Sequence, residues 1–335
     1  MINIFIGLSN NQIKNYEELT PVVEKGERIL ITSKSLKVKK DLFSKIIYTN
    51  QSLNNQSDGI FNSIGNIISK IKAYKNIIKE LDSYKNEKNI RLYFTYIEDI
   101  LTNYLLFSFN KNLKGIVVED GTLNYYNHTI TYLKKEKVYL KKILCELYRV
   151  PFKIYKGHSS GIEYNHVVKQ YVRSPELSLF PNKSESLPYK KRNTTLTNSI
   201  LIIGQEAYIN EQGKELYLSR LKQLLEEVKN NSLYSKIDQI YYKPHRNGAR
   251  INYNLINTSF KNKSVEILDS DTPLEDLYFN KIASKFIYSF DSSALLNIYL
   301  EAEKEIQEQI EFNVLLKYKK ELKPIFEKFN FRIIE

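Results

Sequence analysis

Short apolar runs alternate with longer amphipathic stretches along the first half of the chain, as in the strands and helices of a parallel sheet. The apolar runs predict strands at 2–8, 28–32, 46–49, 90–94 and 114–118. Apolar residues at helical spacing predict helices over 59–85 and 134–148. We therefore expect this half of the chain to form a βαβ domain.

The pattern breaks over 176–198, where proline, serine, threonine and asparagine replace the periodic residues, and we expect an interdomain linker there. The alternation then restarts. It predicts strands at 200–203, 239–242, 265–268 and 285–289, a helix over 213–230, and a last helical region over 301–329 that Pro324 interrupts.

Two similar halves predict an α/β protein of two Rossmann-like domains, 1–175 and 199–335, joined by the linker 176–198 and ending in a C-terminal helix. This arrangement is typical of GT-B glycosyltransferases, whose two domains face a central cleft. Periodicity alone would also fit a periplasmic-binding-protein pair or a dehydrogenase-like pair. No G-x-G-x-x-G follows the first strand of either half, and no P-loop motif is present, which argues against a dinucleotide-binding or P-loop enzyme.

Charge alone does not identify a function. The chain has 50 Lys and Arg against 38 Asp and Glu, a formal net charge of +12. This excess fits a nucleic-acid binder, a protein on anionic lipid or an enzyme with anionic substrates, but the abundance of Lys, Asn, Ile and Tyr also fits an AT-rich genome. The single cysteine, Cys145, excludes an intramolecular disulfide. No apolar run approaches the roughly 18 residues that span a bilayer, so we expect a cytoplasmic protein.

Ligands in open α/β sheets bind at the carboxyl ends of strands, so polar residues just after an apolar run are candidates. Glu119, Asp120 and Gly121 follow the strand at 114–118. Adjacent side chains on a strand point to opposite sides, so one carboxylate can face the cleft while the other braces the loop. A carboxylate in a cleft is a suitable base for a sugar hydroxyl, whereas an ordinary Asp-Gly turn needs no function.

A second candidate is the basic turn Lys243, Pro244, His245 and Arg246, which follows the strand at 239–242. Proline stiffens the turn that presents His245. Three cation-capable side chains suit a phosphate or carboxylate ligand, and a solvated basic loop is the plain alternative. The other three histidines lack metal-ligand spacing, so we expect no metal site.

Other strand ends and helix starts predicted in the second half of the chain carry polar residues suited to binding a nucleotide. Ser292 and Ser293 begin a helix, where they can cap it or direct backbone N–H groups at an anion. Gly204 and Gln205 close a strand, and a glycine there lets a ligand approach the backbone. Glu275 lies in the first turn of a helix, where it can bond a ribose diol or simply favour the helix N-terminus.

The order of these motifs resembles that of the bacterial sialyltransferases of GT-B fold, which include lipooligosaccharide and capsule enzymes and polysialyltransferases. That family carries an acidic pair with glycine in its first domain. Its second domain carries a Gly-Gln-like turn, a His-Pro motif, a ribose-binding Glu and paired serines. The matching residues are Glu119-Asp120-Gly121, Gly204-Gln205, Lys243-Pro244-His245, Glu275 and Ser292-Ser293. The chain departs from the family pattern at one point, because proline precedes His245 instead of following it.

The resemblance implies an inverting, metal-independent sialyltransferase with no cofactor. Its donor would be CMP-sialic acid and its acceptor a galactose-terminated or sialylated glycan of capsule or lipooligosaccharide. Asp120 would be the general base, and His245 would stabilise or protonate the departing phosphate, to which Ser292 and Ser293 hydrogen-bond. Glu275 would hold the ribose.

The remaining candidates have supporting places in this scheme. Four residues would line the donor pocket: Gly204, Gln205, Lys243 and Pro244. Glu119 and Gly121 would support the base, and the polar loop 9–12, with Asn10, is a weaker candidate for the acceptor site.

Two alternatives stay open. One is a GT-B transferase that uses another nucleotide sugar in surface polysaccharide synthesis. The other is a basic nucleic-acid-binding protein, against which the Lys and Arg residues are spread along the chain and no binding motif is present. We expect no nucleic-acid partner. The lysine-rich stretches 70–88 and 134–142 could hold the protein on the anionic inner face of a membrane.

Overall fold

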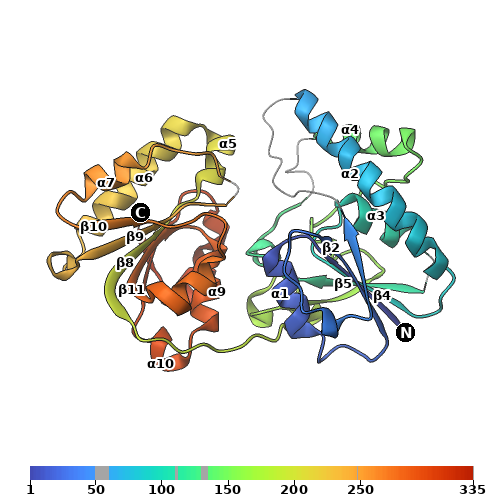
Figure 1. Ribbon diagram of the computed structural model, residues 1–335, viewed down its shortest axis with the longest axis horizontal. Helices are drawn as coiled ribbons and strands as arrows, with labels where there is room; N and C mark the ends of the chain where they lie inside the picture. The colour runs from blue at the N-terminus through green and yellow to red at the C-terminus, as the bar shows by residue number, and fades with distance from the viewer. Residues whose placement is uncertain (50–59, 110–111, 130–134, 247, 335) are drawn as a thin grey trace. The chain divides into compact units, whose positions relative to one another are not determined.

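The computed structural model describes residues 1–49, 60–109, 112–129, 135–246 and 248–334. The chain divides into two compact units, Met1–Tyr189 and Lys190–Glu335, each built on a parallel sheet (Figure 1). The predicted starting residues of two helices, Gly59 and Lys134, lie outside the described residues.

The first unit contains a seven-stranded sheet in the order β3-β2-β1-β4-β5-β6-β7, whose neighbouring strands are all parallel. Its strands are β1 (Ile2–Gly7), β2 (Glu27–Ser33), β3 (Lys45–Thr49), β4 (Ile90–Phe94), β5 (Leu113–Val118), β6 (Val167–Val172) and β7 (Ser184–Ser186). Its helices are α1 (Asn10–Leu19), α2 (Ile60–Leu81), α3 (Ile100–Ser108) and α4 (Lys135–Leu147). All five predicted strands and both predicted helices are confirmed, with end shifts of a few residues.

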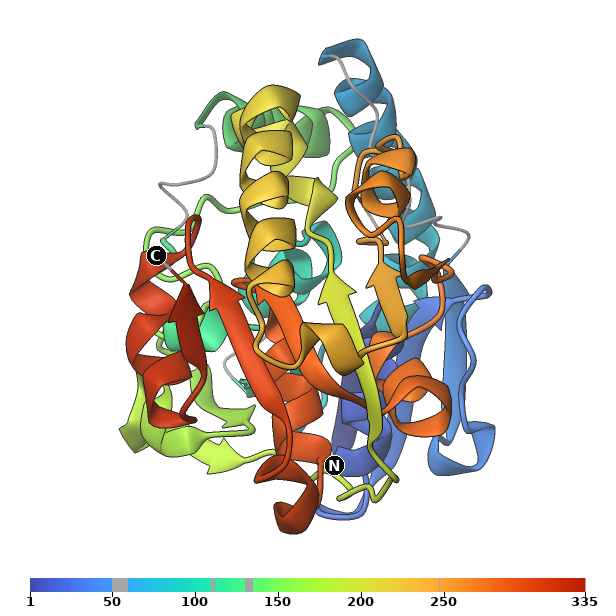
Figure 2. The same cartoon turned by 90° about the vertical axis from the view of Figure 1, so that its left-hand side faces the viewer.

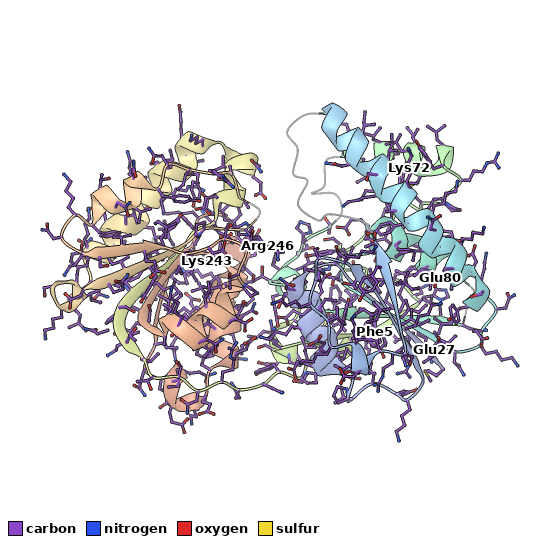
Figure 3. The ribbon with its side chains drawn as sticks, viewed as in Figure 1. Phe5, Glu27, Lys72, Glu80, Lys243 and Arg246 are labelled. Carbon is purple, nitrogen blue, oxygen red and sulfur yellow. The ribbon has the colours of Figure 1, made fainter. Side chains whose placement is uncertain are left out.

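The core of the first unit lies on both faces of its sheet. Phe5 of β1 belongs to one buried cluster and stacks on Tyr93 of β4, with ring centroids 4.4 Å apart. Its neighbours Ile4 and Ile6 belong to the cluster on the other face, with α2, α3 and α4. A strand covered on both faces is mostly apolar, which explains the apolar run of β1, in which Figure 3 labels Phe5. The polar residue of this strand, Asn3, is fully buried.

The second unit contains a six-stranded parallel sheet in the order β10-β9-β8-β11-β12-β13. Its strands are β8 (Thr197–Ile203), β9 (Gln239–Lys243), β10 (Ser264–Ile267), β11 (Ser284–Phe290), β12 (Glu311–Leu315) and β13 (Arg332–Ile334). Its helices are α5 (Ile209–Gln212), α6 (Lys214–Lys229), α7 (Asn254–Ser259), α8 (Leu274–Leu277), α9 (Ser293–Glu301), α10 (Lys304–Gln307) and α11 (Lys323–Lys328). Figure 2 shows α6 (yellow) lying over one face of this sheet, where Leu221 and Leu225 join the core.

The predicted linker over 176–198 does not connect the units as expected. β7 pairs with β6, and Leu187 is fully buried and donates its backbone N–H to Val172 O at 2.8 Å. These contacts hold the chain to the first unit as far as Tyr189, and the second unit begins at Lys190. The polar composition of this stretch therefore led us to predict a linker where part of the chain forms an edge strand, β7.

The predicted C-terminal helix over 301–329 is wrong. Residues 311–315 form β12, which pairs in parallel with β11 and buries Phe312, Val314 and Leu315. Helix is limited to the short α10 and α11 on either side. The local helix preference of the charged residues is overridden because sheet pairing buries the apolar ones.

Candidate functional site

Each sheet has one point at which the strand order reverses. In the first unit this point lies between β1 and β4, and in the second it lies between β8 and β11. Open parallel sheets bind ligands outside the carboxyl ends of their strands at such a point. The residues directly after these strands and their neighbours are therefore the candidates in each unit.

Asp120 is held at the carboxyl edge of the first sheet by three neighbours. Gln12 Nε2 donates to its Oδ2 at 2.8 Å, Asn11 Nδ2 donates to its Oδ1 at 3.2 Å, and the Tyr96 hydroxyl donates to Oδ2 at 3.4 Å. These residues come from the start of α1 and from the segment after β4. Asp120 remains partly exposed. The switch point thus presents one oriented carboxylate.

Glu119 has the opposite environment. It is buried and accepts hydrogen bonds from the Tyr125 hydroxyl and from Arg173 N at 2.7 Å, with the Arg173 guanidinium 3.4 Å away. Burial raises the pKa of its carboxyl group, and the charge of Arg173 opposes that rise. Gly121 turns the chain next with φ of 73°. The predicted division of the pair is present, with Glu119 bracing the loop.

The polar loop expected over 9–12 is the start of a helix. Ser9 caps α1 by accepting from Gln12 N at 3.2 Å, and Asn10 is the first helical residue. Its neighbours Asn11 and Gln12 contact Asp120, so this segment does belong to the Asp120 site. The sequence prediction named this segment and singled out Asn10, whereas the contacts to Asp120 come from Asn11 and Gln12.

A polar segment after β4 was missed. It contains Tyr96, which contacts Asp120, and Glu98, whose buried Oε2 has no hydrogen-bond partner among the described residues. Burial raises the pKa of Glu98 to about 7, and Lys141 opposes the rise. Lys141 donates to the Glu98 backbone oxygen at 2.8 Å. The rule of inspecting each strand end would have found this segment after 90–94.

In the second unit, the residue that organises the candidate site is Glu206, which was also missed. It is buried after β8 and accepts hydrogen bonds from the Tyr242 hydroxyl at 2.6 Å and from His245 N at 2.7 Å. A Cβ on Gly204 would lie 2.4 Å from the Tyr242 hydroxyl and 2.7 Å from Glu206 Oε1. Gly204 therefore makes room for this buried pair. Close approach of a ligand, the role expected from the sequence, stays a prediction.

Next to Gly204, the side chain of Gln205 has a carbonyl oxygen that makes no hydrogen bond to the described residues. The Gln205 backbone N–H donates to the Tyr217 hydroxyl at 3.2 Å, and the side-chain Oε1 is buried. A buried amide oxygen normally has a partner, so it is an acceptor available to a bound molecule.

The basic turn lies at the carboxyl end of β9, where Figure 3 shows Lys243 and Arg246. Lys243 is buried with Pro244, and its amino group donates to the Asp269 backbone oxygen. Burial, together with the positive charges of Arg246, Lys243 and Lys319, lowers the pKa of His245 to about 4. The imidazole is thus neutral at pH 7, and these cations gather near it.

Glu275 and the paired serines lie around α9. Glu275 Oε1 accepts from Asn297 Nδ2 of α9 at 2.6 Å and is partly buried at the start of α8. Ser292 is the N-cap of α9 and accepts from Ala294 N at 3.3 Å, so its hydroxyl already serves the helix. Ser293, the first helical residue, is partly exposed.

Asp291 ties the strand ends of the second unit together. It is buried and accepts hydrogen bonds from the Tyr208 hydroxyl at 2.8 Å and from the backbone N–H groups of Tyr318, at 3.0 Å, and Lys319. These partners come after β8 and β12, while Asp291 comes after β11. The sequence analysis missed Asp291, although its position directly before Ser292 and Ser293 could have indicated it.

The described part of the chain contains no group of three or more His, Cys, Asp or Glu side chains arranged to hold a metal ion. Within the same residues, no helix combines the length and apolar character needed to cross a bilayer.

The comparisons with known proteins identify the fold. A glycosyltransferase of kitacinnamycin has a TM-score of 0.54 and 10% identity, covering 100% of this chain and 86% of its own. Medicago truncatula UGT71G1, complexed with UDP-glucose, scores 0.50 at 8% identity over 100% of this chain and 85% of its own. The Methanocaldococcus jannaschii UDP-GlcNAc 2-epimerase, in complex with UDP-GlcNAc and UDP, has a TM-score of 0.51 and 11% identity, covering 96% of this chain and 87% of its own.

These neighbours confirm the predicted GT-B fold, with its two parallel sheets. No protein-family model and no curated protein matches the chain.

Proposed function

We propose that this protein is a GT-B glycosyltransferase, which moves a sugar from a nucleotide sugar to an acceptor hydroxyl. The observation that carries the proposal is the Asp120 carboxylate, oriented by Gln12 and Asn11 at the switch point of the first sheet. Asp120 is partly exposed, whereas the carboxylate of Glu119 beside it is buried in an ion pair with Arg173. Such a carboxylate can take the proton of an attacking hydroxyl, which leads to inversion at the sugar carbon.

The second unit is the proposed donor-binding unit. The neutral His245 can donate one N–H to a phosphate oxygen, and the neighbouring Arg246 and Lys319 supply positive charge. Glu275 is positioned by Asn297 for a ribose diol, and Gln205 Oε1 can accept from the base. Protein cations can neutralise the leaving phosphate, so we propose that transfer needs no metal.

The nature of the donor is a narrower proposal. Two proteins of the same fold form complexes with UDP-sugars, UDP-glucose in one and UDP-GlcNAc in the other. CMP-sialic acid rests on the family resemblance alone, that is, on the order of the motifs from Glu119 to Ser293. We therefore propose a nucleotide sugar used in surface polysaccharide synthesis, with a UDP-sugar ahead of CMP-sialic acid, and a glycan acceptor.

A donor panel tests both levels of the proposal. The protein is incubated with CMP-sialic acid, UDP-sugars and GDP-sugars, with and without glycan acceptors, and nucleotide release and glycan products are measured. We expect one donor class to release nucleotide in an Asp120-dependent manner and to do so in excess EDTA. Loss of activity on chelation that Mn²⁺ restores would exclude the metal-free mechanism. Conversion of a UDP-sugar to its epimer without transfer would show an epimerase and overturn the proposal.

A further inference from the structure

The helix α4 exposes a line of large apolar side chains. Tyr139, Ile143 and Leu147 follow one another at intervals of four residues and are 57%, 54% and 72% exposed. Four-residue spacing places them on one face of the helix, over a length of about 12 Å. The opposite face, with Val138 and Cys145, is packed into the core. We call these three exposed residues the α4 stripe.

A basic hollow adjoins the C-terminal end of the stripe. It has a volume of about 750 Å³, and the residues that line it include Lys142, Arg149, Lys153, Phe107 and Pro151. Among the described residues that line it, Glu146 is the acidic one, and its carboxylate lies 3.6 Å from the Lys142 amino group. Lys153 lies over the Phe107 ring, 4.9 Å from its centroid. The hollow therefore keeps a net positive charge beside apolar walls.

Arg149 occupies an unfavourable backbone conformation. It follows the last turn of α4 with φ of 59°, a left-handed geometry for which glycine is the usual residue. Backbone strain of this kind concentrates at functional positions. Arg149 therefore lines the hollow from a backbone position that favours glycine.

The neighbouring helix α2 extends the positive charge. α2 contacts α4 in the first unit (Figure 1). Lys72, which Figure 3 labels, is exposed on α2, as are Lys75 and Lys79. The nearest acid on α2, Glu80, is paired with Lys45 at 2.8 Å. On α4 itself, Glu136 is the other exposed acid. Among the described residues of α2 and α4, basic groups thus outnumber acidic ones.

We propose that the α4 stripe and the basic hollow dock this protein on an anionic phospholipid bilayer. The stripe would enter the boundary between headgroups and acyl chains, while Arg149 and its neighbours bind lipid phosphates. A bilayer offers both an apolar layer and negative charge at the required depth. A second copy of this chain would bring the same positive charges face to face, so charge complementarity favours the bilayer.

The absence of tryptophan from the chain allows a direct test of insertion. Leu147→Trp creates a single reporter on the stripe, and Leu216→Trp, at an apolar position on α6 that is 43% exposed, is the matched control. We expect phosphatidylcholine vesicles containing phosphatidylglycerol to shift the emission of the Leu147→Trp variant to shorter wavelength and to leave the control unchanged. Inorganic phosphate alone should produce no shift. An unchanged emission with vesicles, or equal shifts at both positions, would overturn the proposal.

Cosedimentation with the same vesicles tests the two components separately. Ile143→Ser with Leu147→Ser should lower the partition coefficient at least about tenfold, because two large apolar contacts are lost. Arg149→Gly should lower it about fivefold at low salt, the effect of one basic residue near an anionic surface. The same variant should raise the melting temperature by a few degrees, because it relieves the left-handed geometry.

Asn330→Gly is the backbone control, since Asn330 has φ of 57° in the second unit and carries no charge. It should leave vesicle binding unchanged. Unaltered binding by both stripe and arginine variants would refute the bilayer, and a change of oligomeric state in the serine variant would reassign the stripe to an interface between copies. Neither readout depends on transferase activity, so failure here is separate from failure of the proposed function.

Discussion

The carboxylate of Glu206 accepts a hydrogen bond from the backbone N–H of His245 at 2.7 Å, which fixes the turn after β9 to the turn after β8. The Tyr242 hydroxyl donates to the other oxygen of the same carboxylate at 2.6 Å. The position of the His245 ring therefore depends on a buried group that need not touch a donor. Glu206 is a positioning residue in this scheme.

Replacing Glu206 by Gln should weaken donor binding about tenfold, because a charge-assisted hydrogen bond to the turn is lost while the size of the side chain is kept. Calorimetric titration with CMP and UDP measures the effect. Glu211→Gln, at an exposed position in the same unit, is the control and should bind as the parent does. Equal affinity in the Glu206 variant would show that the turn is fixed by other contacts.

His245 should titrate near pH 4 in the free protein, because burial and nearby positive charges lower its pKa from the ordinary value of 6.5. NMR of the four histidines, assigned with His245→Ala, measures it. Bound CMP or UDP should raise the pKa, since a phosphate favours the imidazolium. Because the folded-state pKa is depressed, the stability that this group contributes is present above pH 6.5 and is lost as the pH falls toward 4. Titration near pH 6.5 in the free protein would contradict this environment.

Asp120→Asn should reduce transfer about 10²–10⁴-fold and leave nucleotide binding nearly unchanged, as expected when a general base is removed. Glu119→Gln is the contrasting variant. Its main effect should be on stability, because it breaks a buried pair with Arg173, a loss of about 3–5 kcal/mol. Rate measurements with thermal unfolding separate the two. A stable Glu119 variant that loses transfer, beside an active Asp120 variant, would reverse the assignment.

The strands and the residue types at their ends could be read from the sequence because both are local properties. β1 and β4 are apolar over most of their length, and the polar residues that come after them lie at the carboxyl edge whichever way the sheet is ordered. The order of the strands determines in addition which of these strand ends become neighbours. Asp120 meets Gln12 only because β1, β4 and β5 are neighbours, and a separation of 108 residues leaves no trace in a local pattern.

Buried polar residues were the harder part of the candidate site. Glu206 looks like an ordinary charged residue in the sequence, yet it is 1% exposed and supports the His245 turn. The strand β12 was missed for a related reason, since its apolar residues are buried by pairing with β11, which a local pattern does not show. The positions of the motifs at the strand ends could therefore be predicted from the sequence, whereas the buried residues that fix those motifs in place could not.

Glu98→Gln should flatten the pH dependence of stability of the first unit. Burial raises the Glu98 pKa from 4.5 to about 7, so its stabilising contribution is present below pH 4.5 and is lost as the pH rises through about 7. The variant should exceed the parent in stability by up to about 3 kcal/mol above about pH 8 and should match it near the ordinary pKa of the carboxyl group. Denaturant unfolding at several pH values measures the difference. Glu87→Gln, at an exposed site in the same unit, should keep the parent profile.

Gly204→Ala distinguishes packing from ligand approach at the first strand end of the second unit. An added Cβ would lie 2.4 Å from the Tyr242 hydroxyl and 2.7 Å from Glu206 Oε1, so the buried pair must shift. We expect a loss of stability of about 1–3 kcal/mol, typical of overpacking, together with weaker nucleotide binding because the His245 turn moves with Glu206. Gly65→Ala is the matched control. Gly65 lies within α2, and no atom of the described residues lies within 4 Å of an added Cβ, so the substitution should stabilise the protein by about 0.5–1 kcal/mol. A Gly204 variant as stable as the parent but unable to bind nucleotide would show that the glycine serves the ligand.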